Sequence, residues 1–588
     1  MIYLKGLVQN PAERSGTRLE QGSRVAVIGG GPAGSFFTSF LLQMAKRIGL
    51  ELSVDVYEPR DFTKPGQGCN MCGGVISEVL VQNLAVEGID LPDTLIQRRI
   101  DSYMLHMDVG SIRIPTPLQE KRIAAVHRGP GPRTFRPMNA NSFDAHLLGR
   151  AQELGARVVP NRVRSIDWKD GKPQVHARES LPRSYDLVAS AVGINTKGVE
   201  LRDVPGNGYV APGGTKTWIS EFYLGRNLVK RYIGSSMHIF LLDIPRLDFC
   251  ALIPKSDYVT ICLLGHDVDR ELAQTFLDSK QVRECMPPLW VPPRRFCHCS
   301  PSINVRSAER PFADRLVFIG DCATTKLFKD GIGAAFRTAK AAAITAVFKG
   351  ISADDFSRHY WPVCRAIRGD NRVGRLVFAA TRQIQRRPRA RAALWRTVAD
   401  EQKGGSQPRM SSILWDVFTG SASYTSVLKR GVHPAVWGRL LANFVLKGNS
   451  IAPKRSRRSK MAPGGTGALG KCFKDGEVIY RQGDLGDCMY VIQKGAVDVF
   501  ERRGSQEFLL EELGQGDFFG EMSLFDPEIR PKTMRASGEC WVYKLERDSL
   551  LRRLHEDPSL AFRLIQQMAY RIRDLEESLM RKAEPPSL

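Results

Sequence analysis

Long apolar runs are missing from this chain of 588 residues. A helix that spans a bilayer needs about 20 consecutive apolar residues, and no segment approaches that length. The polar stretch 1–22 has no apolar signal core, so secretion is not expected. The 12 cysteines are too sparse and too irregularly spaced for a disulfide scaffold, which is typical of a reducing cytosol. We therefore expect a cytoplasmic protein, and one too long for a single core.

Acidic residues are scarce relative to basic ones: 62 Asp and Glu stand against 85 Lys and Arg, a formal net charge of +23. The excess gathers in two segments, 365–396 and 454–460. The arginines of the first segment are Arg365, Arg368, Arg372, Arg375, Arg382, Arg386, Arg387, Arg389, Arg391 and Arg396. Three interpretations stay open: a solvated face, contact with an anionic membrane at its inner face, and, with less support, nucleic acid.

A glycine-rich segment near the N-terminus predicts a dinucleotide-binding loop. The apolar strand expected over 25–28 runs directly into Gly29, Gly31 and Gly34, and a helix of small residues follows. These glycines would permit a tight turn, close approach of a pyrophosphate and close helix–strand packing. A second strand ends at Glu58, placed to hold a ribose hydroxyl. The expected cofactor-binding residues here are Gly29, Gly31, Ala33, Gly34, Ser35 and Glu58.

Two later segments repeat the pattern of a strand followed by glycine. One is 185–193, and the other is 315–323, where an apolar strand meets Gly320 and Asp321. A carboxylate at such a strand end can accept hydrogen bonds from a sugar-alcohol chain. Gly331 and Gly333 then open a helix towards a second anionic group.

These three elements, in this order, resemble the glutathione-reductase-type flavoproteins, in their aromatic-hydroxylase and geranylgeranyl-reductase branch. The resemblance covers about 23–350 and implies FAD, with Gly320 and Asp321 at its ribityl chain and pyrophosphate. The family's R-x-x-F-D pattern is incomplete, because Phe143 and Asp144 are present but Ala140 replaces the Arg. No second dinucleotide fingerprint is visible, so electrons would come from a visiting NAD(P)H or from ferredoxin.

The segment 66–76 bears on the reaction. Cys72, Gly73 and Gly74 resemble the Cys-Gly-Gly element that lies near the flavin in geranylgeranyl reductases, which implies a catalytic role for the three residues. Reduction of a C=C bond needs a proton as well as a hydride, and a thiol could supply it. A redox dithiol with Cys69 and a structural role remain alternatives. No metal site is expected, since Cys297-His-Cys299 is too compact to complete one.

Two further segments separate this region from the C-terminus. Residues 352–448 read as basic amphipathic helices, in which the aromatics of 415–420 are expected to pack in a core. Residues 449–470, rich in Lys, Arg, Ser, Pro and Gly, predict a flexible linker.

After the linker, short alternating strands with glycines at 476, 483 and 495 predict a small β-roll. The run 519–533 places a carboxylate and a guanidinium around a short helical turn, a set that can hold a ribose and a cyclic phosphate. The module resembles the cyclic-nucleotide-binding domains of the catabolite-activator and protein-kinase regulatory families, over about 471–580. By that resemblance the binding residues are Gly520, Glu521, Met522, Ser523, Arg530, Lys532 and Thr533.

One position departs from that family. Pro531 stands where a small residue would offer its N–H to the phosphate, and proline has none. A degenerate docking module is therefore the alternative to a cAMP or cGMP site. An amphipathic helix at 560–579 is compatible with a homodimer. Because no helix-turn-helix follows it, sequence-specific DNA binding is not expected.

The sequence thus predicts an α/β FAD-binding Rossmann-type domain with an inserted mixed β-sheet substrate domain, a helical extension and a C-terminal β-roll cyclic-nucleotide-binding domain. The expected boundaries are 1–22 (N-terminal extension), 23–351 (oxidoreductase), 352–448 (helical), 449–470 (linker) and 471–588 (nucleotide module). The expected activity is reduction of isoprenoid C=C bonds, modulated by a cyclic nucleotide, with an isoprenoid or other small apolar substrate drawn from the membrane. Two rivals remain: a flavin monooxygenase or halogenase, and a flavin redox sensor whose C-terminal module docks a partner.

Overall fold

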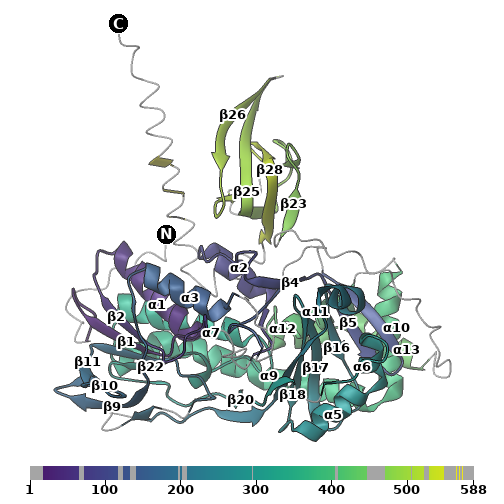
Figure 1. Ribbon diagram of the computed structural model, residues 1–588. Coiled ribbons are helices and arrows are strands. Elements are labelled where there is room, and N and C mark those ends of the chain that lie inside the picture. Colours follow the sequence, from purple (N-terminus) through teal and green to yellow (C-terminus); the bar gives the residue numbers. More distant parts are fainter. Residues whose placement is uncertain are drawn as a thin grey trace. The chain divides into compact units, whose positions relative to one another are not determined.

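The computed structural model describes most of the chain (Figure 1). The described residues are 17–64, 72–116, 123–132, 141–196, 199–201, 208–293, 296–403, 408–445, 470–504, 506–521 and 529–547, with Ile565, Met568, Ala569, Ile572 and Arg573. The chain divides into two units, Met1–Leu80 with Pro92–Gly464, and Val81–Leu91 with Gly465–Leu588. Among the described helices, none is long and apolar enough to cross a membrane.

The first sheet of the larger unit is parallel apart from one edge strand. Its order is β21 (Phe312–Ala313), β22 (Leu316–Phe318), β12 (Leu187–Ser190), β1 (Arg24–Ile28), β2 (Ser53–Tyr57) and β8 (Arg157–Val159). After one exposed residue, β1 and β2 are buried throughout, as in a parallel sheet covered on both faces. Helix α1 (Pro32–Arg47) packs against α3 (Phe143–Glu153) and α7 (Gly331–Ile344). The Rossmann-type prediction is confirmed.

The predicted mixed-sheet insertion is also confirmed. A seven-stranded sheet runs β19 (Cys297–Cys299), β15 (Trp218–Tyr223), β18 (Tyr258–Gly265), β17 (Leu247–Pro254), β16 (Ser236–Phe240), β5 (Ser102–Met107) and β6 (Gly110–Pro115). Its pairs are antiparallel except for β16 with β5. Smaller sheets join β3 (Val75–Ile76), β7 (Ile123–Val126) and β4 (Ile96–Ile100); β11 (Arg183–Ser184), β10 (Lys172–Ala177), β9 (Val163–Lys169) and β13 (Glu200–Leu201); and β14 (Gly213–Lys216) and β20 (Ser302–Arg306).

Helices follow the late glycine segment, as the sequence predicts. They are α8 (Ala353–Asp355), α9 (Trp361–Arg386), α10 (Pro388–Gln402), α11 (Arg409–Thr419), α12 (Tyr424–Gly431) and α13 (Pro434–Val445). The other α-helices among the described residues are α2 (Glu78–Val86), α4 (Arg226–Leu228), α5 (Arg270–Asp278) and α6 (Lys280–Cys285). Trp415 is 2% exposed and meets Tyr103 edge to face with ring centroids 5.1 Å apart. The aromatics of 415–420 therefore pack in a core, as expected.

The smaller unit contains an antiparallel β-sheet, which agrees with the predicted β-roll. Its strands are β23 (Lys471–Phe473), β24 (Val478–Tyr480), β25 (Cys488–Arg503), β26 (Gln506–Leu513), β27 (Phe518–Phe519) and β28 (Thr533–Glu546). Gly476, Gly483 and Gly495 have φ values of 73°, 96° and 83°. At Gly495 an added Cβ would lie 2.5 Å from the Glu539 carbonyl oxygen, so this corner requires glycine.

The core position of Trp415 gives a stability prediction. Replacing Trp415 with Ala should lower the free energy of unfolding by about 3–5 kcal/mol, because it leaves a cavity against Tyr103. Trp437→Ala is the matched control, since Trp437 is 48% exposed and should change the value by less than about 0.5 kcal/mol. Urea unfolding followed by circular dichroism measures both. Equal effects of the two substitutions would contradict the assignment of Trp415 to the core.

Candidate functional site

The first glycine loop joins the end of β1 to the start of α1. Gly29 has a φ of 106°, and Gly31 is the N-cap residue before Pro32. An added Cβ on Gly34 would lie 1.9 Å from the Gly29 carbonyl oxygen, so only glycine permits this approach of helix to strand. Ser35 Oγ donates a hydrogen bond to the Gly30 carbonyl at 2.8 Å, which fixes the loop.

Space over Gly31 is open and bordered by a guanidinium. The only atom within 4 Å of an added Cβ there, among the described residues, is Nη2 of Arg128, at 3.6 Å. Arg128 donates from Nε and Nη2 to both oxygens of Asp144, at 2.9 and 2.8 Å. Burial alone would lower the pKa of Arg128, but the charge and hydrogen bonds of Asp144 raise it above its usual value. A fixed positive charge therefore lies where a pyrophosphate would approach the loop.

Arg128 was absent from the sequence-predicted set. The incomplete R-x-x-F-D pattern had pointed to a missing arginine at Ala140, which lies outside the described residues. Asp144 receives its guanidinium instead from Arg128, which follows β7 by two residues. The sequence feature that could have identified Arg128 is its position in a Gly- and Pro-rich segment directly after an apolar strand.

Glu58 directly follows β2 beside the glycine loop. Its side chain is 3% exposed, and Oε2 accepts the backbone N–H of Gly30 at 3.0 Å. Arg60 donates from Nε to Oε1 at 3.0 Å. The acid therefore lies at the predicted strand end, and ribose binding by it stays a prediction.

The late Gly-Asp segment meets the first loop. Gly320 has a φ of 64°, and an added Cβ would lie 2.6 Å from Cβ of Ala33. The Asp321 side chain is partly exposed, and its carboxylate has no hydrogen-bond partner among the described residues. Burial raises the pKa of Asp321, and the charge of Arg128 opposes that rise. Residues about 290 positions apart in the sequence thus share one edge of the parallel sheet.

Gly331 and Gly333 at the start of α7 differ in the space around them. Its N-cap Asp330 has a φ of 48° and accepts hydrogen bonds from Ser77 Oγ at 2.8 Å and Arg337 at 3.2 Å. An added Cβ on Gly333 would lie 2.3 Å from the Asp330 carboxylate, so Gly333 is required by that side chain. At Gly331 the nearest atom is Thr325 Oγ1, at 3.5 Å. Of the two predicted glycines, Gly331 therefore offers the open approach.

The Cys-Gly-Gly element is held against the end of β7. Gly74 has a φ of 72°, and an added Cβ would lie 2.0 Å from the Val126 carbonyl oxygen. Its N–H donates to Sγ of Cys72 at 3.4 Å, and Cys72 is partly buried. Beside Gly73 lie Ile253 and Cys262. Cys69 lies outside the described residues, so the dithiol alternative stays untested.

A buried ionic cluster lies next to Gly74. Lys255 Nζ donates to Oε1 of Glu221 at 2.8 Å, and its distance to an added Cβ on Gly74 is 3.3 Å. His127 Nδ1 lies 3.4 Å from Lys255 Nζ. Exposed fractions of Lys255, Glu221 and His127 are 0%, 2% and 0%. Two buried atoms, Glu221 Oε2 and His127 Nε2, have no hydrogen-bond partner among the described residues.

The electrostatics of this cluster favour an ion pair beside a neutral imidazole. Burial and the neighbouring Lys255 lower the pKa of His127 to about 3. For Glu221, burial acts to raise the pKa, and Lys255 with His127 brings it below the usual value. The sequence interpretation missed all three residues. The sequence feature that could have identified two of them is a charged residue inside or directly after a strongly apolar strand. Glu221 lies in β15, and Lys255 directly follows β17.

A second buried cluster comprises His106, His238 and Cys285, whose ligand atoms lie within 4.8 Å of one another. His106 Nε2 and His238 Nδ1 are 2.8 Å apart, and the outer nitrogens contact Ser111 Oγ at 2.7 Å and the Ile233 carbonyl at 3.0 Å. Each imidazole can satisfy both nitrogens in this chain of hydrogen bonds. The cluster is therefore complete as a polar element of the core.

The nucleotide module places its predicted residues around a buried arginine. Arg530 is 2% exposed and donates to the carbonyls of Gly520 at 3.0 Å and Cys488 at 2.6 Å. Its guanidinium lies 4.2 Å from the centroid of the Tyr480 ring. Glu521 is 7% exposed.

The remaining predicted nucleotide-binding residues are Met522, Ser523, Lys532 and Thr533. Thr533 Oγ1 accepts the Gln482 N–H at 3.0 Å. Lys532 is partly exposed, and Pro531 is exposed. Met522 and Ser523 lie outside the described residues. The described part of the module therefore brings the predicted carboxylate and guanidinium into one strand-bounded region.

Two solved structures have a partial likeness to the chain. A geranylgeranyl bacteriochlorophyll reductase-like protein from Thermoplasma acidophilum has a TM-score of 0.41 at 13% identity, covering 74% of this chain and 98% of that one. The halogenase PltM in complex with FAD has a TM-score of 0.46 at 14% identity, covering 73% and 96%.

The C-terminal segment has a family match. The model of the cyclic nucleotide-binding domain matches residues 471–557. The cyclic AMP receptor protein of Thermus thermophilus is 35% identical over 113 residues, which are 19% of this chain and 52% of that protein. The chain spans only 7% of another relative, the lysophospholipase nte1 of Aspergillus fumigatus, at 33% identity over 103 residues, or 17% of this chain. Residues 471–557 thus match the model of the cyclic nucleotide-binding domain, and the same chain contains an α/β unit with a largely parallel sheet.

Proposed function

We propose that the larger unit is an FAD-dependent oxidoreductase. The observation that carries this proposal is the open space over Gly31, bordered by the Arg128 guanidinium. Asp321 adds a carboxylate without a partner among the described residues, on the same sheet edge. These groups fit a pyrophosphate and a polyol chain. The residues that would hold FAD are Gly29, Gly31, Ala33, Gly34, Ser35, Glu58, Arg128, Gly320, Asp321, Gly331 and Gly333.

Arg128→Gln should weaken FAD binding by at least about tenfold, because it removes a charge-assisted contact to the pyrophosphate. The matched control is Arg157→Gln: Arg157 makes an equivalent bidentate pair with Asp55, at 2.7 and 2.7 Å, away from the loop. Flavin fluorescence titration of the apoprotein measures the affinity. Thermal unfolding of both apoprotein variants separates a lost contact from a lost fold. Equal loss of flavin in the control would contradict a specific role of Arg128.

For the reaction we propose reduction of C=C bonds in an isoprenoid or similar apolar substrate. When bound and reduced by the electron donor, the flavin would supply the hydride. The chain must then hold a proton for the second carbon, and Cys72, fixed by the N–H of Gly74, is the proposed donor. Apolar side chains flank this element, including Ile253 beside Gly73. NAD(P)H or ferredoxin is the proposed source of electrons.

Oxygen-dependent chemistry, as in a monooxygenase or halogenase, is the second candidate. The buried Lys255–Glu221 pair favours it, because the pair places an ammonium group next to Gly74 of the Cys-Gly-Gly element. Lys255 has no exposed surface and lies 2.8 Å from the Glu221 carboxylate. This pair also offers a fixed ammonium hydrogen-bond donor to a substrate or a reacting oxygen species.

An anaerobic experiment separates the two candidates. The bound flavin is reduced chemically, a geranylgeranyl lipid is added, and reoxidation is followed by absorbance. We expect reoxidation without oxygen, recovery of a more saturated lipid, and slowing by Cys72→Ser of about 10²-fold or more. Cys472→Ser, in the other unit, is the control. Flavin that stays reduced until air is admitted would sink the isoprenoid reductase and favour the oxygenase.

The C-terminal domain is proposed to bind cAMP or cGMP and to modulate the activity of the larger unit. Coupling requires that the nucleotide binds the active and inactive arrangements with different affinity. The family match over 471–557 supports the ligand class, and the buried Glu521 and Arg530 support the ribose and phosphate contacts.

Glu521→Ala should weaken nucleotide binding at least about tenfold and leave the flavin spectrum unchanged, because it removes a ribose acceptor from a separate unit. Arg530→Ala should abolish the nucleotide effect as well, although it also removes two carbonyl contacts of the fold. Arg481→Ala is the control, since that side chain is exposed. Calorimetric titration with cAMP and cGMP measures affinity. Loss of flavin in the Glu521 variant would contradict the two-module picture.

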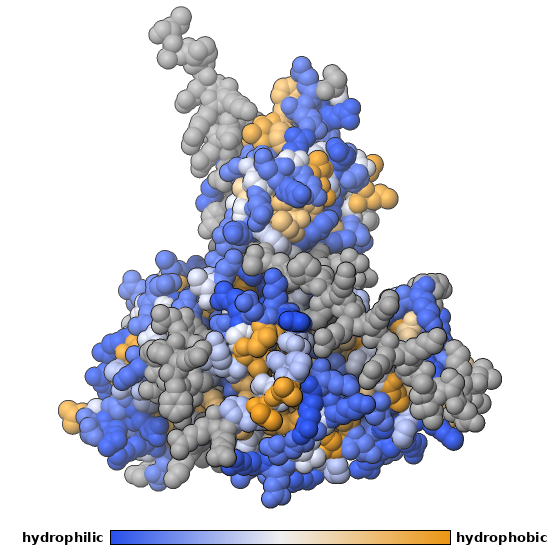
Figure 2. Space-filling model, turned by 45° about the vertical axis from the view of Figure 1, so that its right-hand side comes forward, coloured by the Kyte–Doolittle hydropathy of each residue, from blue (hydrophilic) through white to orange (hydrophobic). Residues whose placement is uncertain are grey.

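Contact with an anionic membrane, at its inner face, is proposed through α13. The face drawn in Figure 2 is mostly hydrophilic, with apolar patches between the hydrophilic residues. Trp437, Leu441 and Phe444 lie four and three residues apart and are 48%, 52% and 39% exposed. That spacing places them on one face of the helix, and such apolar stripes on basic proteins suit the membrane interface. A homodimer through the segment 560–579 stays a proposal, since most of that segment lies outside the described residues.

A further inference from the structure

The arginine-rich segment separates into paired and unpaired members. Arg382 Nη1 donates to Asp248 at 2.8 Å, and Arg391 forms a bidentate pair with Asp108 at 2.6 Å. By contrast, Arg368, Arg372 and Arg375 form no ion pair with any described residue. They lie four and three residues apart on α9, so they share one face of this helix. These three positive charges therefore have no acidic partner among the described residues, and they lie together on one face of α9.

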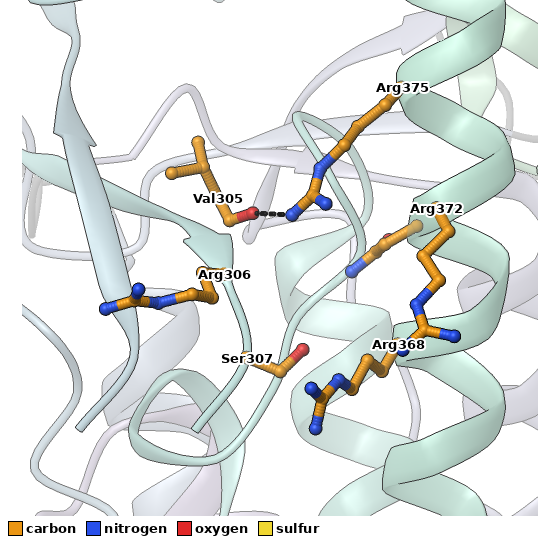
Figure 3. A pocket seen from close by; sticks show the side chains of 7 residues that line it. Val305, Arg306, Ser307, Arg368, Arg372 and Arg375 are labelled. Carbon is orange, nitrogen blue, oxygen red and sulfur yellow. Dashed lines mark hydrogen bonds between the residues drawn. The ribbon is translucent and has the colours of Figure 1, made fainter. Parts of the chain in front are cut away.

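That face of α9 forms one wall of a pocket (Figure 3). The pocket has a volume of about 190 Å³ and is lined by Val305, Arg306, Ser307, Arg368, Asn371, Arg372 and Arg375. Residues at the end of β20 and just after it form the opposite wall, where Arg375 Nη2 donates to the Val305 carbonyl at 2.9 Å. Four of the seven lining residues are arginines and none is acidic.

Asp370, the nearest acid in the sequence, forms no ion pair with these arginines among the described residues. Asp370 accepts the backbone N–H groups of Tyr424 and Thr425, at 3.0 and 2.9 Å, which caps the start of α12. Arg306 likewise has no ion pair within the described part of the chain. Like charges on neighbouring helix positions destabilise a fold, and an anion bound among them would offset that cost.

We propose that this pocket binds the phosphate or diphosphate group of a ligand. Guanidinium groups match phosphate oxygens in geometry and charge. The volume of about 190 Å³ is below the roughly 300–1,000 Å³ typical of sites that enclose a whole small molecule. A compact anionic group therefore fits, whereas a complete dinucleotide or isoprenoid chain does not. A concave site of this size also suits a small anion better than a nucleic acid or a flat membrane surface.

The pocket wall is hydrogen-bonded to the segment that follows Asp321. Asn371 accepts the Leu327 N–H and donates to the Thr325 carbonyl, both at 2.8 Å. On the other wall, Ser307 Oγ lies 2.8 Å from Thr324 Oγ1. The lining residues Ser307 and Asn371 therefore connect an anion held here to the segment that follows Asp321. The source of the anionic group, either the substrate or a phosphorylated electron donor, rests on the proposed function, but the anion site does not.

Calorimetric titration of the full-length, FAD-loaded protein with inorganic pyrophosphate tests the site. We expect binding that weakens as ionic strength rises. Arg368→Gln with Arg372→Gln should weaken it by about 100-fold, or tenfold for each charge-assisted contact. These two side chains have no hydrogen bond or ion pair with a described residue, so the fold should persist. Arg365→Gln, on the same helix outside the pocket, is the matched control.

Absence of pyrophosphate binding, or equal binding by the double variant and the wild type, would overturn the proposal. Competition kinetics then identify the source. If pyrophosphate raises the KM for NADPH but not for NADH, the pocket binds the extra phosphate of the electron donor. If pyrophosphate raises the KM for a prenyl diphosphate, the pocket binds the substrate. Failure of the reductase assay with pyrophosphate binding intact would remove the proposed function while leaving the anion site in place.

Discussion

The buried ion pair between Arg128 and Asp144 is the interaction on which the candidate site depends. Asp144 has no exposed side-chain surface and lies in the first turn of α3, while Arg128 follows β7. Removing Arg128 would leave the charge of the fully buried Asp144 uncompensated, which typically costs about 3–5 kcal/mol. The pair thus fixes a guanidinium beside Gly31 and joins the glycine loop, the three-stranded sheet and α3 in one arrangement.

The charged side chains of the larger unit occur in three different arrangements. Pairs such as Arg382 with Asp248 connect α9 to the mixed sheet. The Lys255–Glu221 pair places opposite charges in a fully buried position beside Gly74, where a low local dielectric strengthens their fields. The arginines of the α9 pocket remain without an acid among the described residues. A net charge of +23 therefore reflects specific local arrangements as well as a solvated surface.

In the nucleotide module, the arginine expected to bind phosphate already has partners. The Gly520 and Cys488 carbonyls and the Tyr480 ring surround the Arg530 guanidinium. A phosphate that engaged Arg530 would compete with these carbonyls, so binding and local rearrangement would be linked. Such an exchange is one physical means by which a nucleotide can favour one arrangement of the chain over another.

Features determined by local backbone requirements could be predicted from the sequence alone. The glycine loops at 29–34 and 320, the alternating strands after 471 and the buried aromatics of 415–420 follow from periodicity and from positive φ angles that only glycine adopts readily. The tertiary structure decided which distant residues meet. Arg128 beside Gly31, Lys255 beside Gly74 and Glu221, and Arg306 opposite α9 are brought together by strand order and helix packing. Charge pairing acts through space, so separation along the chain gives no indication of these contacts.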